Sequence, residues 1–326
     1  MGIRGQQNRG AAVHWCVVTF RKRWSEGRCC PLPAHQFACL QPKPHNRPVA
    51  NTPWQRRIHR ANDLIAKHAF ASEILGFYIH VAGFQQALYE ELEAKRSVGV
   101  PPASQFFQNV RQQDAGATPL GQINPTALLP NFSAFLALIE TKAPTHFAQI
   151  AHGLKSSPAD SWSHLLSYCW SSTAELLAPQ EFLAVAFLQP CAELVRSSTV
   201  LQLESYTLAQ CPLCHRKPAA GILRQQGDGG RRNLLCGFCL TEWEYRRVAC
   251  AGCEEQDHAK LPIYIAESFP HIRVECCDSC RTYLKSVDLT KNGLADPLVD
   301  ELAFVPLDLW AQERGYAKLR ANLLGM

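Results

Sequence analysis

The fold of this 326-residue chain is decided by three stretches of its second half. They read CPLCHRKPAAGIL at 211–223, LLCGFCLTEWEYRRVACAGC at 234–253 and ECCDSCRTYLKSVDLTKNG at 275–293. They contain four Cys-x-x-Cys pairs, here called knuckles, in which two thiolates three positions apart on a tight turn can point at one metal ion. One such pair alone also fits thioredoxin-type redox chemistry, but four within about 70 residues strongly indicate metal binding.

The order of the knuckles along the chain predicts two metal sites. Two successive knuckles supply four ligands, which is the number that a tetrahedral all-thiolate site for zinc or iron requires. The gap between paired knuckles is 21 residues in the first case and 23 in the second, and either gap suits one hairpin. The predicted ligands are Cys211, Cys214, Cys236 and Cys239 for the first site, and Cys250, Cys253, Cys277 and Cys280 for the second. An interleaved pairing, in which the first knuckle joins the third, stays open.

The residues between the cysteines predict short β-strands. Residues 240–248 alternate and are rich in β-formers, and residues 263–265 add a short apolar run. Gly-Asp-Gly-Gly at 227–230 predicts a turn. We therefore expect two small rubredoxin-like or zinc-ribbon modules, at 206–248 and 249–290.

The region before the cysteines predicts an all-α domain at 54–205. Apolar residues recur at every third or fourth position from 71 to 95, which is typical of one face of an amphipathic helix. Further helices are expected at 54–70, 131–139, 144–154, 160–170 and 179–197. Pro190 is expected to kink or interrupt the last of them.

The C-terminal tail at 291–326 is expected to be helical. A helix is predicted at 299–314, and Pro306 interrupts it. The predicted fold class is therefore α+β, with an all-α N-terminal helical domain, two small rubredoxin-like/zinc-ribbon modules and a C-terminal helix.

The positive charge of the chain is concentrated at its N-terminus. Residues 1–53 carry eight basic residues and one acidic residue, whereas residues 54–326 carry 25 basic and 27 acidic residues. The first segment also lacks a sustained helical or strand period, so we expect a poorly ordered basic extension, with a mis-assigned start codon as the alternative. The cysteine region at 206–290 is nearly neutral, with 11 basic and 10 acidic residues, and this balance argues against nucleic-acid binding.

Neither a membrane span nor an export signal is expected. The chain has no run of about 18 uncharged apolar residues, which a membrane-spanning helix would need. The apolar stretch at 11–20 is followed by three basic residues instead of a small-residue cleavage site. Without export, the cysteine pairs are expected to bind metal and not to form disulfides. The oligomeric state is left open, and a homodimer is among the forms considered.

Three cysteines after residue 53 lie outside the knuckles. Cys169 and Cys191 are surrounded by apolar residues in the sequence and are expected to be small buried hydrophobic side chains. Cys276 directly precedes the fourth knuckle, and we assign it no role.

Taken together, these motifs resemble the formate dehydrogenase accessory protein family FdhE. The resemblance rests on the four knuckles, on Thr-Glu-Trp after the second, and on Cys-Asp-Ser-Cys-x-x-Tyr-Leu-Lys at the fourth. LDLWAQERGYAKLRANLLG at 307–325 and RIHRANDLIAKHAFASEILGFYIHVAGFQ at 57–85 extend it to about residues 54–326. Residues 1–53 resemble nothing in that family.

The resemblance implies a cytoplasmic, non-catalytic assembly factor that is needed for active respiratory formate dehydrogenase. Such a factor contacts the catalytic subunit, a molybdenum- or tungsten-containing selenocysteine or cysteine protein with an iron–sulfur cluster. The resemblance also implies iron at the eight cysteines named above. Zinc stays the alternative, because the glycine that often follows a rubredoxin knuckle is absent from all four. The residues at those positions are His215, Leu240, Glu254 and Arg281.

Two functional hypotheses follow. Because no general base lies beside an activated nucleophile in the motifs, the first is a non-enzymatic protein whose cysteine region docks the immature catalytic subunit. Trp243 and Tyr283 are candidate partner-binding residues, since aromatic side chains often dominate interfaces; the alternative is that both pack over the knuckles. The second hypothesis is a rubredoxin-like iron redox or thiol-exchange protein that acts on a client metalloenzyme.

Overall fold

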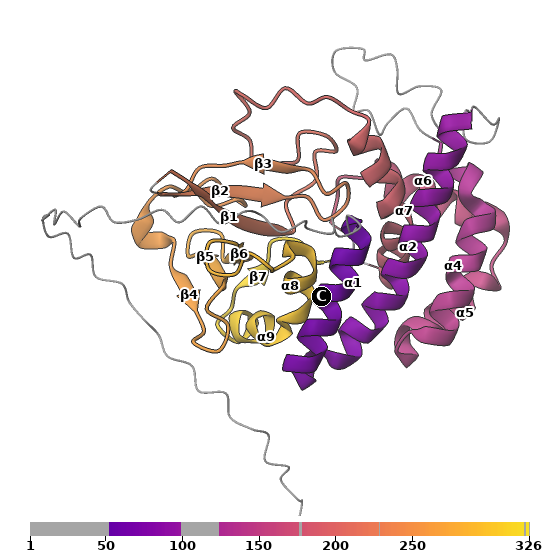
Figure 1. The fold of residues 1–326 in the computed structure, drawn as a ribbon, viewed down its shortest axis with the longest axis horizontal. Helices are drawn as coiled ribbons and strands as arrows, with labels where there is room; N and C mark the ends of the chain where they lie inside the picture. The colour runs from indigo at the N-terminus through magenta and orange to yellow at the C-terminus, as the bar shows by residue number, and fades with distance from the viewer. Residues whose placement is uncertain (1–51, 99–123, 176–177, 228, 323, 326) are drawn as a thin grey trace, which may run out of the picture.

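The computed structural model has a helical N-terminal half and a β-rich C-terminal half, which confirms the predicted α+β class (Figure 1). It describes residues 52–98, 124–175, 178–227, 229–322 and 324–325. Nearly all of the predicted basic extension at 1–53 lies outside these residues. The strands lie to the left in Figure 1, and most of the N-terminal helices lie to the right.

The helices of the N-terminal half follow the predicted positions closely. They are α1 (Pro53–Lys67), α2 (Ser72–Val98), α4 (Leu129–Lys142), α5 (Thr145–Lys155), α6 (Ala159–Ser171) and α7 (Pro179–Ser197), with 3₁₀ turns η1 (Ala69–Ala71) and η3 (Pro125–Leu128). α1 begins at a capping box, in which Thr52 Oγ1 accepts from the backbone of Gln55 and Gln55 Oε1 accepts from the backbone of Thr52. Pro190 lies inside α7 without interrupting it.

The cysteine region forms one mixed sheet. Its strands are β1 (Ala220–Gln226), β2 (Gly229–Leu235), β3 (Glu242–Glu244), β4 (Ile263–Ile265), β5 (Ile272–Cys277), β6 (Thr282–Asp288) and β7 (Ala317–Lys318), and a 3₁₀ turn η4 (His258–Lys260) precedes β4. The order across the sheet is β3-β2-β1-β6-β5-β4, and β7 pairs with β6. The strand predicted at 240–248 is limited to β3, whereas the strand predicted at 263–265 is confirmed.

Each half of the sheet repeats one plan. A knuckle precedes an antiparallel hairpin, a second knuckle follows it, and the next strand pairs back onto the hairpin. β1, β2 and β3 have this arrangement around the first two knuckles, and β4, β5 and β6 have it around the last two. The repeat explains why both gaps between knuckles are similar in length.

The two halves are joined by the parallel pairing of β1 with β6. Gly221 of β1 faces Ser286 of β6 in this pairing. A Cβ atom on Gly221 would clash with the hydroxyl of Ser286 and would lie 3.0 Å from its Cβ. The backbones can approach this closely because position 221 has no side chain.

The predicted C-terminal helix at 299–314 is two helices, as expected from its interruption by Pro306, but the tail beyond them includes β7 and is not helical throughout. α8 (Pro297–Ala303) ends at Phe304, and α9 (Val305–Glu313) starts immediately afterwards. The physical reason is Pro306, which has no N–H for the helix ladder and whose ring would clash with the carbonyl of Leu302 in a continuous helix.

Both short helices are tied to the sheet by buried charges. Lys285 Nζ of β6 lies 2.6 Å from Asp308 Oδ2 of α9 and 3.2 Å from Glu301 Oε1 of α8. Asp300 of α8 also forms a bidentate ion pair with Arg60 of α1. These pairs hold α8 between the helical half and the sheet.

Substituting Gly221→Ala is expected to lower the free energy of unfolding by about 1–3 kcal/mol, because it overpacks the junction between β1 and β6. Urea denaturation of the metal-loaded protein, followed by far-UV circular dichroism, measures this loss. The double variant Gly221→Ala/Ser286→Gly is the matched control, since it removes the clashing hydroxymethyl group. If the double variant were no more stable than the single one, close packing at this junction would not be the cause.

Candidate metal centres

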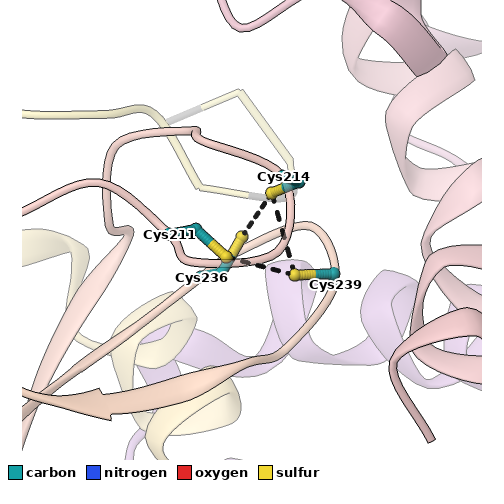
Figure 2. A group of neighbouring side chains, drawn as sticks. All are labelled: Cys211, Cys214, Cys236 and Cys239. Atoms are coloured by element: carbon teal, nitrogen blue, oxygen red, sulfur yellow. Dashed lines mark hydrogen bonds between the residues drawn. The ribbon is translucent and has the colours of Figure 1, made fainter. Parts of the chain in front are cut away.

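The structure brings the eight predicted ligands together in two groups of four. The first centre contains Cys211, Cys214, Cys236 and Cys239, and the second contains Cys250, Cys253, Cys277 and Cys280. In each group, the sulfur atoms all lie within 4.8 Å of one another. Figure 2 shows the sulfur atoms of the first centre converging from two knuckles. The pairing therefore follows the order of the sequence and is not interleaved.

The sulfur spacing fits a tetrahedral ion. In the first centre Cys211 Sγ lies 3.5 Å from Cys239 Sγ, and Cys214 Sγ lies 3.4 Å from Cys236 Sγ. The corresponding distances in the second centre are 3.7 Å and 3.6 Å. Four sulfur atoms bound at about 2.3 Å to a tetrahedral metal are about 3.8 Å apart, whereas a disulfide bond is about 2.05 Å long. The side chains are thus placed to coordinate and not to cross-link.

The backbone of all four knuckles has the same turn. The residue after the second cysteine of each knuckle has a positive φ, between 56° and 64°, and these residues are His215, Leu240, Glu254 and Arg281. A left-handed backbone is where glycine is favoured, which explains why related knuckles often have glycine here. In this turn the backbone N–H groups of Leu213, Phe238 and Gly252 point at cysteine sulfur atoms, at 3.4, 3.4 and 3.2 Å.

The first centre is enclosed by the helical half of the protein. Its four cysteines are at most 6% exposed, and they belong to the hydrophobic core that the helices share with the sheet. Gln189 of α7 donates to the carbonyl of Gly237 at 2.8 Å, inside the second knuckle. The ring of Phe238 in the same knuckle packs edge-on against Trp170 of α6. The knuckles and the helices therefore fix one another.

Two buried arginines supply positive charge near the first centre. Arg216 is 1% exposed, lies over the ring of Phe238, and donates to the carbonyls of Ser172 and Trp170 at the end of α6. Arg320 is 7% exposed; burial and the charge of Arg216 lower its pKa, while the thiolates of Cys236 and Cys214 raise it.

Each of these arginines has one buried nitrogen, Nη1, without a hydrogen-bond partner. A divalent ion with four thiolates has an excess of two negative charges, so buried cations with spare donors fit such a group. The residues present are therefore compatible with a metal at this centre.

The second centre is open to solvent on one side. Cys253 is exposed and Cys280 is half-buried, whereas Cys250 and Cys277 are buried. Burial raises the pKa of the Cys280 thiol, but hydrogen bonds with the hydroxyl and backbone of Thr282, together with those to Cys253 and Cys277, lower the pKa to about 7. Close to neutral pH, Cys280 therefore has substantial thiolate character, which is the form that binds metal.

A threonine next to each centre was missed by the sequence reasoning. Thr241 Oγ1 lies 3.1 Å from Cys239 Sγ, and Thr282 Oγ1 lies 3.0 Å from Cys280 Sγ. Each threonine follows its cysteine by two residues, so a repeated Cys-x-Thr was the available signal. Arg320 left no such signal, because it is far from the knuckles in sequence.

The cysteines outside the knuckles lie outside both centres. Cys169 and Cys191 are buried, as predicted, and burial raises the pKa of both thiols. Cys276 is 3% exposed, and burial raises its pKa to about 12. Its sulfur atom lies outside both groups of four, so Cys276 is not among the candidate ligands.

The two candidate partner-binding aromatics are buried. Trp243 is 2% exposed and its indole donates to the carbonyl of Leu208 at 3.1 Å. Tyr283 is 1% exposed and its hydroxyl donates to Asp308 Oδ1 at 2.8 Å. Neither ring is exposed to a partner in this structure: the burial of both agrees with a packing role, although their hydrogen bonds are to Leu208 and Asp308 and not to the knuckles.

Comparison with known proteins agrees with this architecture. Residues 210–247 match the central domain of FdhE, and residues 248–324 match the FdhE C-terminal domain. Over residues 210–324 the chain is therefore similar to FdhE proteins. The crystal structure of the FdhE protein from Pseudomonas aeruginosa matches with a TM-score of 0.61 and 27% identity, over 83% of this chain and 95% of that one.

Relatives named FdhE homologues extend the similarity over most of the chain. The homologue from Aquifex aeolicus is 26% identical over 270 residues, which are 82% of this chain and 94% of the relative. The homologue from P. aeruginosa is 38% identical over 135 residues, which are 40% of this chain and 43% of the relative. Both FdhE domain matches contain a complete four-cysteine centre, so the centres are part of the region that relates this chain to the family.

Zinc-loaded protein is expected to release its two ions to a chelator in two phases, with the faster phase from the exposed second centre. A chelating dye in excess, followed by its absorbance, measures both phases. The variant Cys253→Ser should lose the fast phase and keep the slow one, with one ion per chain by native mass spectrometry. Release of both ions in one phase would show that the difference in burial does not control metal exchange.

At the third knuckle, Glu254→Gly is expected to be more stable than Glu254→Ala by about 1 kcal/mol. Both variants remove the weak contact between Glu254 and Arg246, at 3.4 Å, but only glycine relieves the left-handed backbone at φ 64°. Thermal unfolding of the two metal-loaded variants, side by side, measures the difference. Equal stability would indicate that this turn carries no backbone strain.

Proposed function

We propose that this protein is an accessory or assembly protein that is required for the activity of formate dehydrogenase. In this proposal it binds the catalytic subunit through the metal-bound four-cysteine region. The observation that carries the proposal is the presence of both centres within the FdhE-matching residues, 210–324. The resemblance to the FdhE family then indicates that the partner is the catalytic subunit of formate dehydrogenase.

We infer a binding role and not an enzymatic one. At each centre the four protein ligands complete the coordination of a tetrahedral ion, as in structural metal sites, and catalytic sites instead keep one position open for substrate or water. A closed set of ligands supports a scaffold that holds its modules in shape for a partner.

Iron is our proposed metal, with zinc as the alternative. Four thiolates in a tetrahedron suit either metal, and iron in such a site supplies one-electron chemistry.

The exposed Cys253 favours a second candidate function, in which the second centre takes part in redox or thiol exchange with a client metalloenzyme. Visible absorption of anaerobically purified protein separates the candidates: a red, reversibly reducible product supports iron with redox capacity, and a colourless protein with two zinc ions supports a scaffold.

The cytoplasm is the proposed site of action, by resemblance to the family. Among the helices that the structure describes, none has the length and apolar character needed to span a bilayer.

The catalytic subunit of formate dehydrogenase is expected to co-purify with this protein from formate-grown cells under anaerobic conditions. The variant Cys250→Ser/Cys253→Ser should retain less of the subunit, because the second module would lose its metal. Mass spectrometry of the eluate identifies the partner. An eluate without any formate dehydrogenase subunit, from cells that contain the active enzyme, would refute the proposed function.

A further inference from the structure

An apolar pocket of about 150 Å³ opens beside the second centre. Its floor includes Cys250 of the third knuckle, together with Leu284 and Leu319, and all three are buried. At its mouth Val248 and Ile263 are 52% and 49% exposed. The hollow thus joins a buried apolar floor to an exposed apolar rim.

The pocket lies on the open face of the second module. Cross-strand neighbours share a face, so Ile263, Glu275 and Leu284 point to one side of β4, β5 and β6. The opposite face is covered by α9, where Tyr264 packs on Trp310. The pocket therefore faces away from the C-terminal helices, on the side formed by the loop that contains the third knuckle.

The acidic residue that lines the pocket is paired with a cation, whereas a basic residue at its rim is not paired with any described acidic residue. Glu275 in its wall is neutralised by Arg232, whose Nη2 lies 2.6 Å from Glu275 Oε2. Arg247 at the rim is exposed, and no acidic partner for it is present in the part of the chain that the structure describes. The rim therefore has one free cation beside an apolar hollow, which is complementary to an apolar group next to a carboxylate.

The free edge of the sheet, at β4, lies beside this pocket. β4 pairs with β5 on one side and ends the sheet, so its other edge has no strand partner among the described residues. Ile263 at the pocket rim is the first residue of this edge strand. An exposed edge of this kind pairs readily with an extended peptide, whose alternate side chains then enter adjacent pockets.

We propose that this pocket binds an extended segment of the client protein, in which a bulky apolar side chain enters the pocket and a neighbouring carboxylate pairs with Arg247. The proposal rests on the proposed function, because it takes the catalytic subunit of formate dehydrogenase as the client. A dry apolar cavity of about 150 Å³ can hold a molecule of benzene, so the side chain of Leu, Ile, Met or Phe matches its size. The pocket of the second module, whose lining includes the buried Tyr283 but not Trp243, is then the docking surface.

The test uses overlapping 15-residue peptides that span the formate dehydrogenase catalytic subunit of the same organism, each labelled with fluorescein. Fluorescence anisotropy with the full-length metal-loaded protein measures binding. Peptides that bind should contain Leu, Ile, Met or Phe within two residues of Asp or Glu. Replacing that apolar residue by Ala should weaken binding by about tenfold or more.

Charge reversal separates recognition from a structural effect. Arg247→Glu should weaken the same peptides by about two- to fivefold, and peptides with Lys in place of the acidic residue should regain affinity for this variant. Arg246→Glu is the matched control: it changes the same charge at the adjacent exposed residue, which does not line the pocket. The proposal would be overturned if Arg247→Glu left peptide affinity unchanged, if both variants weakened it equally, or if no peptide bound.

Co-purification tests the docking site separately from the proposed assembly function. The variant Arg247→Glu/Ile263→Asp changes only exposed positions and should lose the catalytic subunit that the unaltered protein retains. If this variant retained the subunit equally well, the pocket would not be the docking site, although the assembly role would stand. If the unaltered protein also failed to retain it, the proposed function itself would fail.

Discussion

The convergence of four sulfur atoms at each centre is the constraint on which the β-rich half depends. The strands around the centres have two to seven residues, and short hairpins of this kind are only marginally stable in water. The knuckles also hold four non-glycine residues in a left-handed backbone, which is unfavourable for each of them. Metal–thiolate bonds that form only in the folded state can offset both costs, because the free energy of metal binding then contributes directly to folding.

The same arrangement of four cysteines occurs in two different surroundings. The first centre lies under α6 and α7, with Arg216 connecting its first knuckle to the end of α6. No helix covers the exposed side of the second centre in the described residues, and Cys253 faces solvent there. The two centres therefore differ in position: the first joins the helical half to the sheet, and the second lies at the protein surface.

Several features of the fold could be predicted because they depend on local patterns. Apolar spacing identified the long helices, and the regular gaps between knuckles favoured the sequential ligand pairing that the structure shows. The break between α8 and α9 was predicted from Pro306, and the structure places it at Phe304. The extent of β3 was overestimated: residues 240–248 fit a strand by composition, but the strand ends at Glu244, after which the N–H of Tyr245 still donates to the carbonyl of Arg232 at 3.0 Å. The parallel pairing of β1 with β6 had no sequence signal, because it joins residues that are far apart in the chain.

The sequence by itself determined eight cysteines at knuckle spacing, enough for two four-cysteine groups that could hold metal ions, and a helical domain before them. Spacing is sufficient for this, because a Cys-x-x-Cys turn positions its two thiolates locally. Only the tertiary structure decided which centre is buried, that Trp243 and Tyr283 are inside the modules, and that an apolar pocket with Arg247 at its rim opens beside the second centre. Burial and access arise from contacts between segments distant in sequence, so no local pattern could have specified them.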